Sequence, residues 1–302
     1  MAKPGKYSLW NNDIIETDKA TVAITSSAVL YGLSVYSVFF AKYREDGLLG
    51  FRVPEHITRI KQSAKIIGLN HTEEFLNKEV FLKNIHKLIE VNKPTSDQFF
   101  RLTIHATEIL PGVRTTDLEL ALSVFMYEAK NILPQDKARL KTSLWRRTAD
   151  TAIPARAKVN GAYVNSALAK QDALDSGVDD CLFLNQNGYV SELSAANIFM
   201  VKRGVLVTPD PASDILEGIT RRSIIEIAKR NKIKVVERKV ALTELYASDE
   251  VFACGTSAFV SPITQIDQRT IGTGVAGEMT MFLKEILRNE QKDKNSDWVT
   301  IL

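Results

Sequence analysis

The chain has 302 residues, of which 45% are apolar and 25% are charged, and its formal net charge is +3. This length allows one large domain or two medium ones, and the composition is that of a folded globular protein rather than a disordered or fibrous one. Because the lysines and arginines are scattered among acidic residues, the charge gives no sign of a nucleic-acid-binding surface.

The cysteines and the apolar segments indicate in which compartment of the cell the protein is expected. The two cysteines, Cys181 and Cys254, lack metal-ligand spacing, which predicts a reduced, cytoplasmic protein and no metal site. The first six residues lack an apolar segment, so we expect no secretory signal. Residues 20–41 carry no charge, as in a membrane span, but Thr, Ser and Gly residues interrupt them. We therefore predict buried strands joined by a short turn, and no membrane contact.

The first half of the chain is predicted to mix strands with two helices. Its elements after the uncharged segment are helices at 55–69 and about 72–91, and strands at 99–107 and 118–127. In the first helix Ile57, Ile60 and Ala64 recur at helical spacing, so one face is apolar. In the first of the strands apolar and polar residues alternate, which places Arg101 and His105 on one face.

The second half follows a segment at 130–141 that contains a proline and several charges, and that we interpret as a linker. Its predicted elements are strands at 142–147, 180–184, 189–192, 197–201, 205–208 and 250–254, and helices at about 162–176, after 218–220, and at about 277–289. Asn187-Gly188 is a strong hairpin-turn signal. Hairpins with helices at intervals predict an α+β fold rather than repeating βαβ units.

Lys158 is the first candidate for chemistry. It stands among small and apolar residues, in Ala155-Arg-Ala-Lys158-Val-Asn-Gly-Ala-Tyr163. An isolated lysine is usually a solvated surface charge. In this setting, however, desolvation would favour the neutral, nucleophilic amine that a Schiff base requires.

A carboxylate and two glycine-marked turns complete the candidate site. Glu192 ends a hairpin strand, where it is either an exposed carboxylate or the partner of a pyridine nitrogen. Gly218-Ile219-Thr220 opens a helix, and Gly255-Thr256-Ser257 follows a strand. Both are ordinary turn sequences, but free N–H groups at such turns also bind phosphate. Together with the amine of Lys158, these groups are what pyridoxal phosphate requires.

The same segments occur in this order in a known family. From about residue 30 to residue 271 the chain resembles the class IV pyridoxal phosphate aminotransferases, most closely the branched-chain amino acid aminotransferases. The matching segments are Tyr31-Gly32-Leu-Ser-Val, Glu55-His-Ile-Thr-Arg59, Ala157-Lys158-Val-Asn-Gly-Ala-Tyr163, Ser191-Glu192 with Asn197-Ile-Phe199, Leu216-Glu-Gly218-Ile219-Thr220-Arg221, and Asp249-Glu-Val-Phe with Gly255-Thr256. Six segments in order are more specific than any one of them.

The resemblance implies roles for individual residues. Lys158 is the implied catalytic residue, which binds the cofactor covalently and moves a proton. Tyr163 and Glu192 would contact the phenolic oxygen and the ring nitrogen of the cofactor. The implied phosphate-binding residues are Arg59, Ile219, Thr220 and Thr256. The implied substrate-binding residues are Tyr31, Tyr36, Arg101 and Ser257.

The departures from the family pattern lie on the substrate side. Where the branched-chain enzymes usually have Phe-Glu-Gly-Ile-Arg, this chain has Tyr36-Ser37-Val38-Phe39-Phe40. Phe99 stands where those enzymes commonly have a tyrosine. Val38 and Phe40 either narrow a substrate pocket or are buried strand residues, so the sequence leaves the substrate open.

The resemblance also implies the architecture and the reaction. We expect a two-domain α+β enzyme with the D-amino acid aminotransferase-like fold, and with the cofactor between the domains. The predicted division is a smaller α+β domain at 1–129, a linker at 130–141, and a larger cofactor-binding domain with a barrel-like sheet at 142–302. The predicted activity is ping-pong transfer of an amino group from an aliphatic, branched-chain L-amino acid to 2-oxoglutarate, as in branched-chain amino acid biosynthesis. The enzyme is expected to be a homodimer or a higher homo-oligomer.

Other functions remain open at this point. Within the same fold, the alternatives are a D-amino acid aminotransferase, an amine transaminase, and an enzyme like aminodeoxychorismate lyase. Outside it, the chain is either a binding protein that keeps the fold without catalysis or, on the uncharged segment alone, a membrane sensor.

Overall fold

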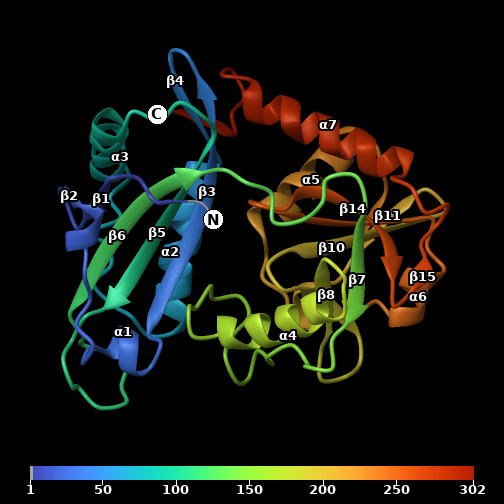
Figure 1. The fold of residues 1–302 in the computed structure, drawn as a ribbon, viewed down its shortest axis with the longest axis horizontal. Helices are drawn as coiled ribbons and strands as arrows, with labels where there is room; N and C mark the ends of the chain where they lie inside the picture. Colours follow the sequence, from blue (N-terminus) through green and yellow to red (C-terminus); the bar gives the residue numbers. More distant parts are fainter. Residues whose placement is uncertain (1–2) are drawn as a thin grey trace. The chain divides into compact units, whose positions relative to one another are not determined.

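The computed structural model describes residues 3–302 and divides the chain into two compact units (Figure 1). The first unit holds residues 3–130, Ala157–Ala162 and Glu290–Leu302, and the second holds Asn131–Arg156 and Tyr163–Asn289. The chain therefore enters the first unit three times. As a result, the short segment that contains Lys158 belongs to the unit that the first part of the chain forms.

The first unit is built around a sheet with the order β16-β4-β3-β5-β6-β1-β2. Its strands are β1 (Tyr7–Trp10), β2 (Asp13–Glu16), β3 (Ser34–Arg44), β4 (Gly47–Phe51), β5 (Gln98–Ala106), β6 (Leu120–Glu128) and β16 (Val299–Ile301). Neighbouring strands run antiparallel. The long strands β3, β5 and β6 are rich in β-branched and aromatic residues, which fit a pleated, half-buried surface.

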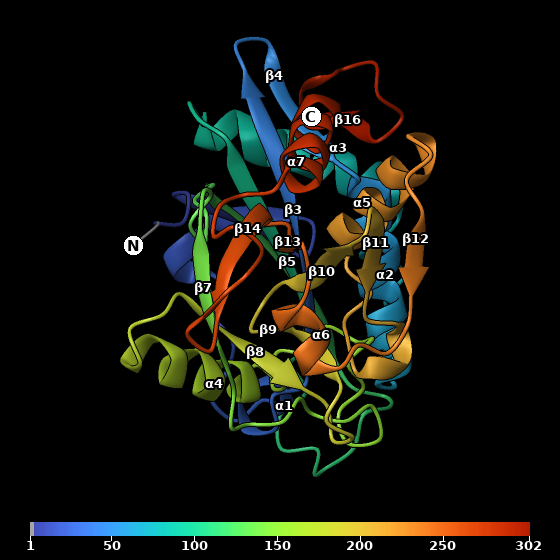
Figure 2. The ribbon, with the colours of Figure 1, turned by 90° about the vertical axis from the view of Figure 1, so that its right-hand side faces the viewer.

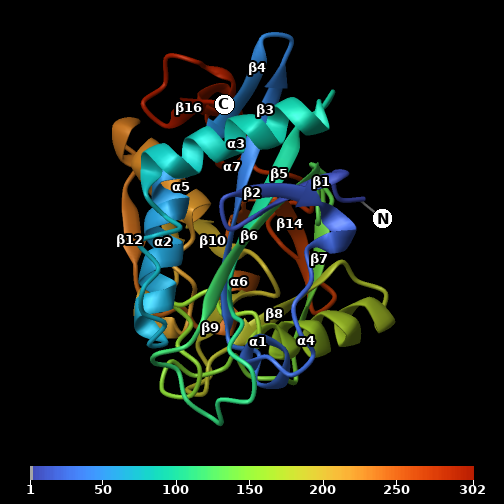
Figure 3. The same cartoon turned by 90° about the vertical axis from the view of Figure 1, so that its left-hand side faces the viewer.

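One face of this sheet carries the core of the first unit. Phe39 of β3 lies opposite Phe100 of β5, and their rings stack with centroids 4.8 Å apart. Helices α2 (Val53–Ile66) and α3 (Lys78–Asn92) cover the face and bury Ile60 and Ile85 (Figure 3). The short helices η1 (Thr17–Lys19) and α1 (Ser27–Leu30) precede β3. Because successive strand residues alternate in direction, the residues next to the core-facing ones, such as Arg101, point to the other face.

The second unit is built around a sheet with the order β12-β11-β10-β13-β14-β7-β8-β9, with β15 beside β14 (Figure 2). Its strands are β7 (Ala138–Thr142), β8 (Asp180–Leu184), β9 (Val190–Leu193), β10 (Asn197–Lys202), β11 (Val205–Thr208), β12 (Val235–Glu237), β13 (Glu250–Gly255), β14 (Phe259–Ile266) and β15 (Arg269–Thr270). The pairs β11–β12, β14–β7 and β7–β8 are parallel, and the other pairs are antiparallel. The sheet curls into a half-barrel around apolar side chains that include Leu182, Ile198 and Ile263.

Helices flank this second sheet. They are α4 (Tyr163–Asp175), η2 (Pro211–Ser213), α5 (Ile219–Arg230), α6 (Leu242–Tyr246) and α7 (Glu278–Lys292). The α5 helix buries Ile224 and Ile227, which are spaced three residues apart on one face. The carboxylate of Glu250 accepts hydrogen bonds from the backbone N–H groups of Met279 and Thr280, so it satisfies donors at the start of α7.

The structure corrects several sequence-based expectations. The uncharged segment 20–41 forms α1 and most of β3 rather than two strands, because its Ser-rich start makes a helical turn. The predicted helix at 72–91 begins at Lys78, where Asn77 accepts hydrogen bonds from two backbone N–H groups as N-cap.

Two further corrections concern the middle and the end of the chain. Residues 138–141, expected in a linker, form β7 together with residue 142, and β7 lies between β14 and β8. Residues 143–147 form a loop, whereas a strand was predicted at 142–147. Residues 157–162 and 290–302, expected in the larger domain, belong to the first unit, where β16 pairs with β4. The sequence did not predict that these two segments join the first unit, because short segments that complete an existing sheet need no periodicity of their own.

Candidate functional site

The Lys158 segment lies along the first part of β3, which β4 does not pair with because β4 reaches only residues 41–44. The backbone N–H of Tyr36 donates to the Lys158 carbonyl at 3.0 Å, and Val35 forms an antiparallel bridge with Val159. The backbone N–H of Lys158 donates to Ser63 Oγ of α2 at 3.1 Å. Val159 is buried in the core of the first unit, so the strand alternation turns Lys158 to the opposite face.

Five polar and aromatic residues gather on that opposite face. Lys158 Nζ lies 4.8 Å from the centroid of the Tyr36 ring, and the guanidinium carbon of Arg101 lies 3.7 Å from the same centroid. Arg101 Nη2 donates to Asn160 Oδ1 at 2.7 Å, and Asn160 Nδ2 donates to Ser34 Oγ at 2.7 Å. Two cations thus share one aromatic ring, and a neighbouring amide fixes one of them.

Tyr31 and Arg59 also belong to the first unit. Tyr31, the C-cap residue of α1, is 41% exposed, and the next residue, Gly32, has a φ of +68°. A Cβ atom at Gly32 would lie 3.0 Å from Gly161 Cα, so the backbone after Tyr31 passes close to the Lys158 segment. Arg59 lies on α2, where its Nη2 donates to Ser37 Oγ of β3 at 2.8 Å.

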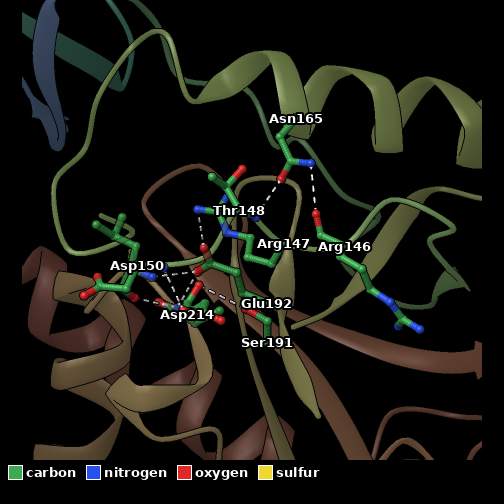
Figure 4. Close-up of polar contacts among 10 residues, drawn as sticks. Arg146, Arg147, Thr148, Asp150, Asn165, Ser191, Glu192 and Asp214 are labelled. Atoms are coloured by element: carbon green, nitrogen blue, oxygen red, sulfur yellow. Dashed lines mark hydrogen bonds and ion pairs between the residues drawn. The ribbon is translucent and has the colours of Figure 1, made fainter. Parts of the chain in front are cut away.

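In the second unit, both carboxylate oxygens of Glu192 are bound by Arg147, Asn197 and the backbone of Leu216, an arrangement that we call the Glu192 clamp (Figure 4). Arg147 Nη2 lies 2.9 Å from Glu192 Oε1, and the two side chains are 12% and 7% exposed. Glu192 Oε2 accepts from Asn197 Nδ2 at 3.0 Å and from the backbone N–H of Leu216 at 3.2 Å. The guanidinium and these donors favour the ionised form of the carboxylate.

The loop that carries Arg147 is itself fixed (Figure 4). Asn165 of α4 accepts from the backbone N–H of Thr148 at 3.3 Å and donates to the carbonyl of Arg146 at 3.0 Å. Asp214 accepts from the backbone N–H of Asp150 at 3.0 Å. Side chains outside the loop therefore bind its backbone before and after Arg147, and this holds Arg147 in place.

The start of α5 lies next to the Glu192 clamp. Gly218, the N-cap residue of α5, makes no side-chain cap, and a Cβ atom there would lie 2.2 Å from Asn197 Oδ1. Asn197 Nδ2 also donates to the carbonyl of Leu216 at 2.8 Å. Asn197 thus joins the carboxylate to a helix N-terminus that has no side-chain cap, where Ile219 and Thr220 begin the first turn.

The turn with Thr256 and Ser257 connects β13 to β14 in the same unit. Asn197 of β10 is paired with Cys254 of β13, and the turn begins at Thr256, two residues after Cys254. A Cβ atom at Gly255 would lie 3.4 Å from the carbonyl oxygen of Ala195. The backbone N–H of Ile132 donates to the Ser257 carbonyl at 3.1 Å and holds the turn.

The predicted residues thus form two sets. Tyr36, Arg101 and Lys158 make one cluster in the first unit, while Arg59 and Tyr31 lie on adjoining elements of that unit. In the second unit Glu192 is bound by Asn197, Ile219 and Thr220 begin α5, Thr256 and Ser257 lie in the turn after β13, and Tyr163 is the first residue of α4. Sequence reasoning missed Arg147, Asn160 and Ser63 as partners of the predicted residues. Asn160 was within the matching segment, whereas nothing in the sequence distinguishes Arg147 from Arg146.

The remaining expectations concern membranes and cysteines. Within residues 3–302 the structure contains no helix with the length and apolar character that a membrane crossing needs. Cys181 and Cys254 are buried and unpaired, and burial raises the pKa of the Cys254 thiol to about 12. Both are therefore unreactive core residues at neutral pH.

Comparison with known proteins gives the family. Residues 41–266 match the family described as amino-transferase class IV. The chain is 35% identical over 294 residues, which are 95% of this chain and 93% of the relative, to a probable branched-chain-amino-acid aminotransferase from Aquifex aeolicus (strain VF5). The chain belongs to the class IV aminotransferase family, and the prediction of an aminotransferase is confirmed.

Solved structures agree with this result. A branched-chain aminotransferase from Thermoproteus uzoniensis, crystallised with norvaline, matches with a TM-score of 0.91 at 29% identity over 98% of this chain and 99% of that one. One from Thermobaculum terrenum in its PLP form matches with a TM-score of 0.90 at 30% identity over 98% of both chains. Within class IV, the chain therefore groups with the branched-chain amino acid aminotransferases, and the predicted fold is confirmed.

Proposed function

We propose that the protein uses pyridoxal phosphate to transfer the amino group of a branched-chain L-amino acid to 2-oxoglutarate by a ping-pong mechanism. The observation that carries this proposal is the placement of Lys158. Its backbone is fixed by α2 and β3, and its side chain lies over Tyr36, beside Arg101. A lysine held in this way is suited to act as a nucleophile.

The second unit fits the cofactor chemically. Glu192 is a buried carboxylate beside Arg147, as a pyridine nitrogen partner would be, and the start of α5 lacks a side-chain cap. The absence of a Cβ atom at Gly218 leaves room for the Asn197 side chain that links the two features. Relatives of known structure contain the cofactor: a further branched-chain amino acid aminotransferase, with a TM-score of 0.88 at 31% identity, holds pyridoxamine 5′-phosphate.

Bound pyridoxal phosphate supplies an electron sink for charge that develops at the substrate α-carbon. Lys158 Nζ binds the cofactor covalently and, once released, moves the α-proton. Glu192 holds the ring nitrogen, and Tyr163 donates to the phenolic oxygen. Arg59, Ile219, Thr220 and Thr256 bind the phosphate, with the backbone donors at the start of α5 acting together with the helix dipole.

The proposed substrate residues are Tyr31, Tyr36, Arg101 and Ser257. The face of the first sheet beside Arg101 is aromatic: Phe99 packs on Phe40 at 5.9 Å and on Tyr127 at 5.7 Å between ring centroids. This surface suits an aliphatic side chain, and the Arg101 guanidinium suits the distal carboxylate of 2-oxoglutarate. Of the two residues that depart from the family pattern on this strand, Phe40 is 5% exposed and Val38 is half-buried.

Association into a homodimer or a higher homo-oligomer is also proposed. Val29, Leu30, Ile109 and Leu110 are 54%, 45%, 57% and 69% exposed. The two chain segments that carry them lie side by side, because the Leu110 N–H donates to the Thr25 carbonyl and the Ser27 N–H to the Glu108 carbonyl. An apolar patch of this kind marks an interaction surface, and light scattering of the purified protein tests it. The buried free cysteines support a cytoplasmic location.

A substrate panel tests the proposed function. The purified protein reconstituted with pyridoxal phosphate is assayed with L- and D-amino acids and with amines, using 2-oxoglutarate as acceptor. We expect activity with L-leucine, L-isoleucine and L-valine and none with their D forms. Lys158→Ala should abolish turnover and remove the visible absorbance of the covalently bound cofactor. Activity with D-alanine or amines alone would replace this function by one of the alternatives within the fold.

A further inference from the structure

Ser37 is a buried polar residue in the apolar stripe of β3. Val35, Phe39 and Ala41 on the same strand face the core of the first unit, and the alternation puts Ser37 among them. Ser37 is 0% exposed and lies opposite Leu102 of β5. A hydroxyl at such a position is costly unless it is hydrogen-bonded, so its partners explain its presence.

The partners of Ser37 lie one helical turn apart on α2. Arg59 Nη2 is 2.8 Å from Ser37 Oγ, Ser37 Oγ is 2.9 Å from His56 Nδ1, and Arg59 Nη2 is 3.4 Å from the same nitrogen. A guanidinium only donates, so Ser37 Oγ and His56 Nδ1 both accept from Arg59, and the hydrogen bond between them is donated by the Ser37 hydroxyl. His56 then carries its proton on Nε2. The hydroxyl and the imidazole thus form two acceptors for one amino group of Arg59.

This arrangement fixes a long side chain before any ligand arrives. Arginine is among the side chains that lose most rotamer freedom on ordering, so a guanidinium held in advance lowers the cost of binding an anion. The backbone of Arg59 is fixed as well, because its carbonyl accepts from Ser63 Oγ at 2.9 Å. Ser63 Oγ also accepts from the backbone N–H of Lys158, so both residues share one support within the first unit.

We propose that Ser37 and His56 are positioning residues that orient the Arg59 guanidinium toward the 5′-phosphate of the cofactor. This inference rests on the phosphate-binding role of Arg59 in the proposed function. It assigns to Ser37, which departs from the family pattern, a part in cofactor affinity rather than in substrate choice. The effect should therefore depend on the phosphate group of the ligand.

Equilibrium binding to the full-length apoenzyme tests the inference. Pyridoxamine 5′-phosphate and pyridoxamine are titrated into each variant and followed by calorimetry, since neither ligand forms a covalent bond with Lys158. The quantity compared is the ratio of the dissociation constant of pyridoxamine to that of pyridoxamine 5′-phosphate. This ratio measures the preference for the phosphorylated ligand, and it therefore isolates the contribution of the phosphate group to binding. In Ser37→Ala we expect this ratio to fall about ten-fold, with pyridoxamine binding unchanged, because a hydrogen bond to a charged group is lost. Ser37→Thr keeps the hydroxyl and should keep the ratio.

Control variants separate positioning from stability. Ser123→Ala removes another Ser–His hydrogen bond of the same unit, 2.9 Å between Ser123 Oγ and His105 Nε2, and should leave the ratio unchanged. His56→Leu should lower the ratio as Ser37→Ala does, while His56→Asn, which keeps an acceptor near the Nδ1 position, should largely preserve it. The His56 pair serves as the test if Ser37→Ala does not fold, as judged by its melting temperature.

The outcomes are distinct. If the unaltered protein does not prefer the phosphorylated ligand, the cofactor role in the proposed function fails. If it does prefer that ligand, but Ser37→Ala and His56→Leu keep the same preference, the hydrogen bonds among Ser37, His56 and Arg59 are only structural. The proposed positioning role of Ser37 and His56 is then overturned. A fall in the ratio in both variants, with no change in Ser123→Ala, supports it.

Discussion

The guanidinium of Arg147 lies 2.9 Å from a carboxylate oxygen of Glu192, and both side chains are largely buried in the second unit. A buried carboxylate of this kind is stable as an anion only while its donors remain. The other oxygen is bound by Asn197 and by the backbone of Leu216, so the carboxylate is fixed in direction as well as in charge.

Replacing Arg147 by Gln should destabilise the protein. The change leaves Glu192 buried without its guanidinium, and the expected loss in free energy of unfolding is about 3 kcal/mol. Urea denaturation of the apoprotein measures it. Arg146→Gln is the matched control, because Arg146 is exposed, and it should cost less than about 0.5 kcal/mol. Equal effects of the two variants would show that the ion pair contributes little.

Replacing Gly218 by Ala should disturb the clamp from the other side. The new Cβ atom would lie 2.2 Å from Asn197 Oδ1, so Asn197 would have to leave its place between Glu192 and Leu216. We expect a loss of about 2 kcal/mol in stability. The double variant with Asn197→Ala removes the clash, so its loss should be smaller than the sum of the single losses. Additive losses in this double-mutant cycle would contradict the steric explanation.

Replacing Asn160 by Ala should release Arg101 on the face of the first sheet. The side chain loses the acceptor at 2.7 Å but keeps its contact with the Tyr36 ring. If Arg101 binds the distal carboxylate of 2-oxoglutarate, the KM for this acceptor should rise about ten-fold with little change in kcat. The monocarboxylic acceptor 2-oxohexanoate provides the comparison. A rise of the same size for both acceptors would argue against this role of Arg101.

His105 should make stability depend on pH. Burial, with a smaller effect of Arg101, lowers the pKa of His105 from 6.5 to about 4. The unfolded chain therefore binds a proton between these values that the folded chain does not. The stability contributed by the neutral ring is complete above pH 6.5 and is lost as pH falls toward 4.

At about pH 5 this loss should be about 2 kcal/mol relative to about pH 8. Urea denaturation at both values, with His105→Gln as comparison, isolates the histidine from the titrating carboxylates. The variant should lose less stability between the two pH values than the unaltered protein does. His86→Gln, at an exposed position, should behave like the unaltered protein. Identical pH profiles for all three proteins would refute the prediction.

The long elements were predictable because their periodicity is local. The α2 helix shows its buried face in Ile57, Ile60 and Ala64, and the hairpin of β8 and β9 is marked by Asn187-Gly188. The fold followed from the resemblance and is confirmed by the solved structures. The roles of the individual site residues stay predictions.

The sequence by itself determined the residue types and the order of the matching segments, because an amine, a carboxylate and glycine turns are encoded position by position. It did not determine which unit each segment joins. Lys158 lies beside β3 because Val159 completes the core of the first unit. Glu192 of β9 meets Arg147 because the loop after β7 passes beside the neighbouring strand β8, where the Arg147 N–H donates to the Leu184 carbonyl. Such pairings depend on packing and hydrogen bonding between residues far apart in the chain, and only the tertiary structure decides them.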